Sequence, residues 1–140
     1  MKRFFSTIAA AVLLVSFGSS QEPLMHTKDT PEEVKKNLKD KKAILLDVRS
    51  MDEWEAGHLK DATFMPLTEM KKVDEDKLKA LAKDKIIYTH CGAGRRALEA
   101  GKILKEKGFD VRPLKLGFED LVNEGFPKAE EKKKDDKEKN

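Results

Sequence analysis

The sequence predicts an α/β fold, in which a small and mainly parallel β-sheet is flanked by helices on both faces. Short apolar runs at residues 43–48 and 86–89 have the composition of buried strands. They alternate with segments whose apolar residues recur at helical spacing. Because ligands of such sheets bind beyond the carboxyl ends of the strands, Cys91, which follows the second run, is a candidate functional residue.

The first half of the chain has two helix starts around one strand. Thr30, followed by Pro31 and Glu33, combines an N-cap, a first-turn proline and a capping box, which predicts a helix over residues 31–38. The apolar run at 43–48 predicts a strand buried on both faces. Ser50 and Glu53 repeat the capping-box pattern, so a short helix is expected before Gly57.

The second half continues the alternation of strands and helices. An extended piece at 62–67, interrupted by Pro66, precedes a helix expected at 74–81 with Leu78 and Leu81 facing inward. A strand at 86–89 is followed by a helix at 96–107, which Gly108 ends. A last strand is expected at 111–115, and a last helix between Gly117 and residue 122.

The two ends of the chain differ from this middle part. Lys2 and Arg3 precede an apolar run at 4–17 and small residues at 18–20, which predicts a signal peptide at residues 1–20. A run of about 14 residues is shorter than the roughly 20 that cross a bilayer, although an uncleaved anchor is the alternative. Residues 128–140 are nearly all charged and predict a disordered tail. One domain remains, at residues 24–127.

A signal peptide predicts a periplasmic or secreted protein without a stable membrane anchor after cleavage. Loss of Lys2 and Arg3 would leave 27 of the 29 basic residues against 26 acidic ones, so we expect no nucleic-acid partner. Cys91 is the only cysteine and cannot form a disulfide within the chain, so packing alone must hold the core. We expect a monomer.

The segment from Cys91 to Arg96 has the composition of an anion-binding loop. Two glycines, Gly92 and Gly94, permit positive φ, and the following helix directs its first N–H groups and partial positive charge toward the loop. A thiol in this position, with Arg95 and Arg96 at the rim, is expected to be acidic and reactive. The alternative is that Cys91 is a small buried hydrophobic residue.

Three spaced motifs resemble the rhodanese family of thiosulfate sulfurtransferases. The first runs from Leu46 through Asp47 and Arg49 to the Gly57-His58-Leu59 turn, the second is the six-residue loop 91–96, and the third spans 117–127. A signal peptide before one such domain is similar to exported rhodaneses of the phage-shock type. The chain departs from the pattern at Leu116, where glycine is common, and at Leu121, where tryptophan is common.

The resemblance implies a role for each site residue. Cys91 is the expected catalytic nucleophile, and the residues expected to bind the substrate are Gly92, Ala93, Gly94, Arg95 and Arg96. Asp47, Arg49, Glu53 and His58 are expected to support the site, with Arg49 paired to a carboxylate such as Glu53. His90 is expected to point away from the face that carries Cys91. No cofactor is implied, and three scattered histidines with one cysteine predict no metal site.

Sulfur transfer is the reaction that this loop favours. Cys91 would take the sulfane sulfur of thiosulfate or a similar donor as a persulfide and pass it to cyanide or a thiol. A phosphatase or arsenate reductase is a weaker alternative, because a Cys-x5-Arg loop would need arginine at position 97, where Ala97 stands. A non-catalytic or redox-sensing rhodanese module is the other alternative.

Overall fold

The computed structural model describes residues 22–81 and 83–130 of the 140-residue chain and confirms the predicted fold class. Its four strands form one sheet in the order β2-β1-β3-β4, with every neighbouring pair parallel. The strands are β1 (Ala43–Asp47), β2 (Thr63–Phe64), β3 (Ile86–His90) and β4 (Asp110–Pro113). The two central strands, β1 and β3, are the predicted apolar runs.

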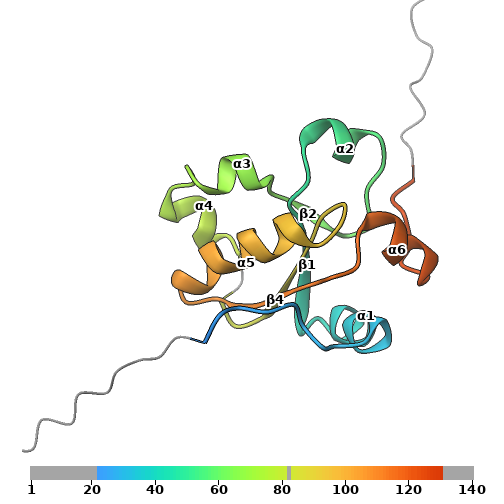
Figure 1. The fold of residues 1–140 in the computed structure, drawn as a ribbon. Coiled ribbons are helices and arrows are strands. Elements are labelled where there is room, and N and C mark those ends of the chain that lie inside the picture. The colour runs from blue at the N-terminus through green and yellow to red at the C-terminus, as the bar shows by residue number, and fades with distance from the viewer. Residues whose placement is uncertain (1–21, 82, 131–140) are drawn as a thin grey trace, which may run out of the picture.

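Helices cover both faces of the sheet (Figure 1). On one face lie α3 (Leu67–Met70), α4 (Glu75–Lys79) and α5 (Arg95–Glu106), and on the other lie α1 (Pro31–Lys39) and α6 (Phe118–Asn123). The short α2 (Met51–Glu55) follows β1 and has no buried residue. Both predicted capping boxes are present, at Thr30–Glu33 and at Ser50–Glu53.

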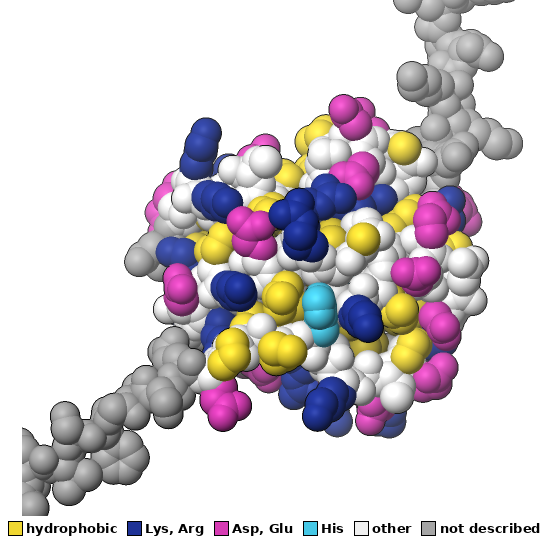
Figure 2. Space-filling view, in the orientation of Figure 1, with side chains coloured by type: hydrophobic (Ala, Val, Ile, Leu, Met, Phe, Trp, Pro, Cys, Tyr) yellow, Lys and Arg dark blue, Asp and Glu magenta, His cyan; other side chains and the backbone are white. Residues whose placement is uncertain are grey.

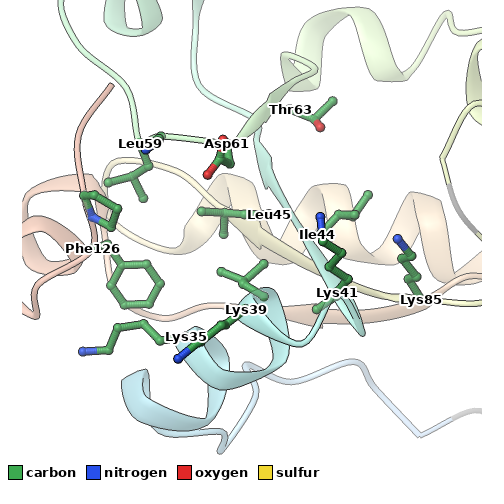
Figure 3. A pocket seen from close by; sticks show the side chains of 14 residues that line it. Lys35, Lys39, Lys41, Ile44, Leu45, Leu59, Asp61, Thr63, Lys85 and Phe126 are labelled. Atoms are coloured by element: carbon green, nitrogen blue, oxygen red, sulfur yellow. The ribbon is translucent and has the colours of Figure 1, made fainter. Parts of the chain in front are cut away.

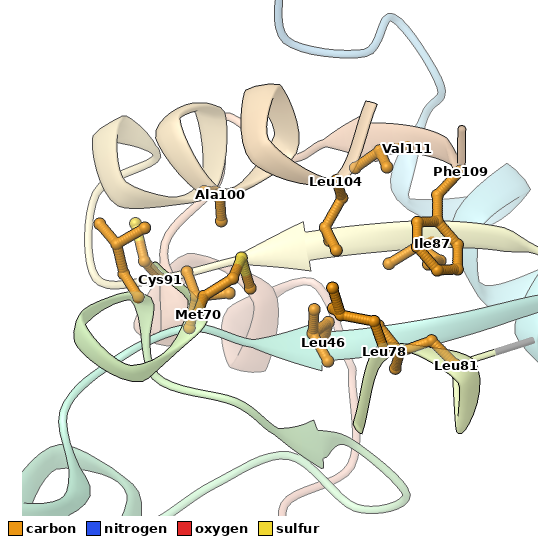
Figure 4. Packing of buried hydrophobic residues seen from close by; sticks show 13 residues of the cluster. Leu46, Met70, Leu78, Leu81, Ile87, Cys91, Ala100, Leu104, Phe109 and Val111 are labelled. Atoms are coloured by element: carbon orange, nitrogen blue, oxygen red, sulfur yellow. The ribbon is translucent and has the colours of Figure 1, made fainter. Parts of the chain in front are cut away.

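The core consists of two clusters, one on each face of the sheet. Because side chains alternate along a strand, Leu46, Ile87 and Cys91 belong to the cluster under α5, whereas Leu45 and Tyr88 belong to the cluster under α1 and α6. Figure 4 shows the α5 cluster, with Cys91 and Met70 at one end and Phe109 and Leu81 at the other. The candidate nucleophile is therefore part of the packed core.

The structure differs from the sequence-based prediction between residues 62 and 70. We expected an extended piece up to Leu67, but β2 ends at Phe64, and Pro66 is the N-cap of α3. Leu67 and Met70, one helical turn apart, both pack into the α5 cluster. Packing of these two side chains against α5 stabilises α3. The helix has only 4 residues, which is too short to show a helical spacing of apolar residues in the sequence.

The ends of the domain are held by long-range contacts. The Thr27 N–H donates to the Pro113 carbonyl at 2.8 Å, and Asp29 accepts hydrogen bonds from Tyr88 and Arg112. Lys128 and Ala129, which we expected to begin the tail, contact the chain at Leu59 and His58. The predicted signal peptide and residues 131–140 of the predicted tail lie outside the described residues.

The described surface carries charges of both signs. Figure 2 shows lysines and arginines interspersed with acidic side chains over the visible face. Within residues 22–81 and 83–130, no helix has the length and apolar character needed to cross a bilayer.

Candidate active site

Cys91 lies directly after β3, at the carboxyl edge of the sheet and before α5. Its side chain is only 1% exposed. The Gly94 N–H donates to the Cys91 Sγ across 3.1 Å. The thiol is thus held inside the turn that leads into the helix, and a thiolate or persulfide there would receive this N–H and the positive end of the α5 dipole.

Gly94 has the backbone conformation that the loop requires. Its φ is +84°, in the left-handed region that glycine adopts without strain, and it is the N-cap of α5. A Cβ at this position would lie 2.6 Å from the Lys115 carbonyl oxygen. Both the left-handed turn and the close neighbour exclude a larger residue, so glycine is needed to direct this N–H toward the sulfur.

The start of α6 closes the other side of the loop. The Phe118 N–H donates to the Cys91 carbonyl at 2.8 Å. A Cβ on Gly117 would lie only 1.8 Å from the Gly92 carbonyl oxygen, so the two backbones are in direct contact there. Sequence reasoning placed Gly117 before the last helix but missed this role, because the contact depends on how α6 packs.

Arg96 is held beside the loop by Glu53. Its guanidinium makes two hydrogen bonds to the Glu53 carboxylate, at 2.6 and 2.8 Å. This pairing, with the Ser50 backbone as a further donor, lowers the pKa of Glu53 to about 2 despite partial burial. The same pairing raises the pKa of Arg96, with a smaller contribution from the adjacent Cys91 side chain. Arg96 is therefore a fixed cation next to the thiol.

Arg49 pairs with a carboxylate, as expected from the sequence, but not with Glu53. Instead, it makes side-chain hydrogen bonds to both oxygens of Asp47 at 2.8–3.1 Å and another to the Gly57 carbonyl at 2.8 Å. Its guanidinium lies over the Phe118 ring, 4.1 Å from the centroid. Asp47 and Arg49 are both buried, and Asp47 lies two residues back along the chain, so the short connection favours this partner.

His90 lies on the opposite face of β3 from Cys91, as strand alternation predicts. It is fully buried, and neither ring nitrogen has a partner of good hydrogen-bond geometry among the described residues. The Nε2 lies 3.6 Å from the Asp47 carboxylate. Burial lowers the pKa of His90 to about 4, although the nearby Asp47 opposes this shift. The ring is therefore neutral at physiological pH.

The remaining predicted residues lie around the loop. Arg95 and Ala93 are both exposed, and no ion pair joins Arg95 to another described residue. The His58 ring stacks on Trp54 with centroids 3.6 Å apart, and its Nδ1 lies 3.0 Å from the Trp54 carbonyl oxygen. His58 therefore orders the turn after α2, which also supplies the Gly57 carbonyl to Arg49.

His26 is a site neighbour that sequence reasoning missed. No sequence motif includes this residue, yet its Nε2 lies 3.0 Å from the Gly94 carbonyl oxygen. The Thr27 contact with β4 and the Asp29 contacts with Tyr88 and Arg112 hold this segment in place. No local pattern could reveal an interaction between residues 68 positions apart.

The burial of Cys91 limits which reactants can reach it. To reach the thiol, a sulfur donor must offer a terminal reactive atom without bulky substituents, or the loop at 92–96 must shift. Gly92 and Ala93 are exposed and form the outer wall of the loop. In the described part of the chain, no group of three His, Cys, Asp or Glu side chains is placed to hold a metal ion.

Comparisons with known proteins show which family and fold this chain resembles. A family model described as a rhodanese-like domain matches residues 30–124. A solved structure of a rhodanese-related protein from Thermoplasma volcanium has 25% identity and a TM-score of 0.60, and the match covers 71% of this chain and 93% of that one.

Two sequence relatives are much longer than the shared region. A Porphyra purpurea protein named "Probable molybdopterin-synthase adenylyltransferase" is 35% identical over 82 residues, 59% of this chain and 21% of the relative. A Bacillus subtilis protein named "Putative sulfur carrier protein" is 34% identical over 65 residues, 46% of this chain and 33% of the relative. This chain thus spans a fifth to a third of these relatives. On the family match and the shared fold, the chain belongs to the rhodanese-like domain family.

Proposed function

We propose that this protein is a thiosulfate sulfurtransferase that carries a sulfane sulfur on Cys91. The observation that carries the proposal is the Gly94 N–H directed at the Cys91 Sγ at the start of α5, with the Arg96 cation fixed beside it. Membership of a family with sulfur-transferring members supports it, as does the similarity to a protein named as a sulfur carrier.

The reaction has two steps on one sulfur atom. The Cys91 thiolate attacks the outer sulfur of thiosulfate, the S–S bond of the donor breaks, and sulfite leaves with the bonding electron pair. Cys91 then carries a persulfide, whose terminal sulfur is attacked by cyanide or a thiolate. This second attack breaks the new S–S bond and returns the electron pair to Cys91 as a thiolate.

The residues of the loop have separate tasks in this proposal. The Gly94 N–H and the other loop N–H groups from Gly92 to Arg96 stabilise the anionic sulfur before and after transfer. Arg96, held by Glu53, offsets the charge of the departing sulfite, whereas the exposed Arg95 attracts the dianionic donor. The outer sulfur of thiosulfate is a single terminal atom, which suits a thiol that is nearly inaccessible.

Intact mass tests the first step without an acceptor. Incubation with thiosulfate should add about 32 Da, one sulfur, to the wild-type protein and nothing to Cys91→Ser. The folded state of Cys91→Ser should be checked by circular dichroism. An unchanged wild-type mass would contradict the proposal and favour a non-catalytic module. Transfer from thiosulfate to cyanide with ping-pong kinetics tests the full cycle.

The location belongs to the same proposal. The basic start, apolar run and small residues at 1–20 support export, with a mature chain beginning near Gln21 in the periplasm or outside the cell. Cell fractionation with N-terminal sequencing tests this, and an intact Met1 on cytoplasmic protein would contradict it.

A further inference from the structure

Away from Cys91, the surface over β1 and the start of β2 is hollowed. A cavity of about 580 Å³ opens over β1, between α1 and the segment 59–63. This volume is within the range of small-molecule sites in proteins. The cavity is lined at the start of β1, near Ala43, whereas Cys91 follows the carboxyl end of β3, so the two sites lie toward opposite ends of the strands.

The cavity is apolar at one end and cationic at the other. Figure 3 shows Phe126 and Leu59 at one end of the lining, Leu45 in the middle, and Lys41 and Lys85 at the other end. Leu45, Leu59 and Phe126 are buried beneath the cavity and are already held by the core. An apolar group entering there would find a rigid wall.

The lysines at the cationic end lack acidic partners. Neither Lys41 nor Lys85 forms an ion pair with any described residue. Lys41 follows α1 and Lys85 precedes β3, so the favourable effect of basic residues at the end of α1 does not explain both. Asp61 is the one acidic residue of the lining, and it lies beside Leu59, away from Lys85.

Lys35 is the exception at the apolar end. Its ammonium group donates to the Glu124 carbonyl at 2.7 Å and lies over the Phe126 ring. This lysine is therefore already engaged, whereas Lys41 and Lys85 at the other end have no ion-pair partner among the described residues.

We propose that this cavity binds a single-chain amphiphile with an anionic headgroup, such as a medium- or long-chain carboxylate. The alkyl chain would lie along Leu45 toward Leu59 and Phe126, and the headgroup would contact Lys41 and Lys85. Burial of the chain and pairing of the charge act together, because each end of the cavity matches one part of the ligand. This site is independent of the chemistry at Cys91.

Calorimetric titration of the folded protein with decanoate tests the proposal. We expect saturable binding of one decanoate, and at least about 10-fold weaker binding of decyltrimethylammonium, which has the same chain and the opposite charge. Acetate, which has the headgroup alone, should be equally weak. Equal binding of decanoate and the cationic amphiphile, or no saturable binding of decanoate, would overturn the proposal.

Two variants locate the binding within the cavity. The double variant Lys41→Gln/Lys85→Gln should weaken decanoate by about 10-fold, whereas the matched Lys102→Gln/Lys105→Gln on α5 should leave it unchanged. Leu38→Trp, at a partly buried position of α1 in the lining, should fill part of the cavity and abolish binding. Thermal unfolding checks that each variant folds. Binding that both cavity variants leave intact would place the amphiphile elsewhere and refute the proposal.

Discussion

The arginines near Cys91 and the lysines around the cavity are held in opposite ways. Arg49 and Arg96 each make bidentate contacts to a carboxylate, Asp47 and Glu53 respectively. Lys41, Lys60 and Lys85 have no such partner among the described residues. Paired arginines position a backbone and fix a charge near one atom, whereas unpaired lysines leave charge available to a ligand. The same domain thus has arginines fixed by carboxylates beside Cys91 and lysines without ion pairs around the cavity.

The largest expected effect is on the free energy of unfolding, and it distinguishes a paired arginine from an unpaired lysine. Arg49→Met leaves Asp47 as a buried carboxylate without its partner, which should lower the free energy of unfolding by about 3–5 kcal/mol. Lys41→Met on the exposed rim should change it by no more than about 0.5 kcal/mol. Urea unfolding of both variants measures the difference. Similar effects of the two substitutions would contradict the comparison.

The next effect tests the contact that closes the loop. Gly117→Ala places a Cβ against the Gly92 carbonyl oxygen and forces the loop or α6 to shift. We expect a loss of about 2–3 kcal/mol in unfolding free energy, together with most of the persulfide formation.

Gly108→Ala is the matched control for that variant. Gly108 has a φ of +89°, but the Cβ that alanine would add there meets no neighbouring atom within 4 Å, so only backbone strain of about 1 kcal/mol is expected. Its persulfide formation, measured by intact mass, should match the wild type. An equal loss of persulfide formation in both variants would show that the reaction does not depend on the contact between Gly117 and Gly92.

His90 should make the free energy of unfolding decrease as the pH falls. Its folded-state pKa of about 4 lies below the unfolded value of 6.5, so the unfolded chain takes up a proton first as the pH falls. Stability is therefore lost from about pH 6.5 down to about pH 4, amounting to about 2 kcal/mol between pH 7 and pH 5.

Urea unfolding at several pH values measures this loss. His90→Leu should remove that part of the pH dependence, because leucine does not titrate. A wild-type stability that is constant from pH 7 to pH 5 would argue against a buried neutral ring.

The smallest expected effect concerns the contact between His26 and the loop. His26→Ala removes one hydrogen bond to the Gly94 carbonyl, worth about 1 kcal/mol, and should slow persulfide formation by about 5-fold. His26→Gln keeps a donor and should restore most of the rate. Stopped-flow or quenched mass measurements with thiosulfate give the rate, and an unchanged rate in His26→Ala would mean that the other contacts hold the loop.

The sequence by itself determined the alternation of elements and the place of the thiol. Capping residues at Thr30 and Ser50, the apolar runs of β1 and β3, and Gly108 are local signals, and local signals specify where a helix or strand begins and ends. Cys91 followed by two glycines and a helix also lies within one short segment. Its position at the carboxyl edge of the sheet was therefore predictable.

Only the tertiary structure decided which residues meet around that thiol. The pairing of Arg96 with Glu53, the contact of Gly117 with Gly92 and that of His26 with Gly94 join segments 25 to 68 residues apart. The choice of partner for Arg49, the formation of α3 and the burial of Cys91 likewise depend on how the helices pack on the sheet. Such contacts depend on distances between elements, and a pattern within one element carries no information about those distances.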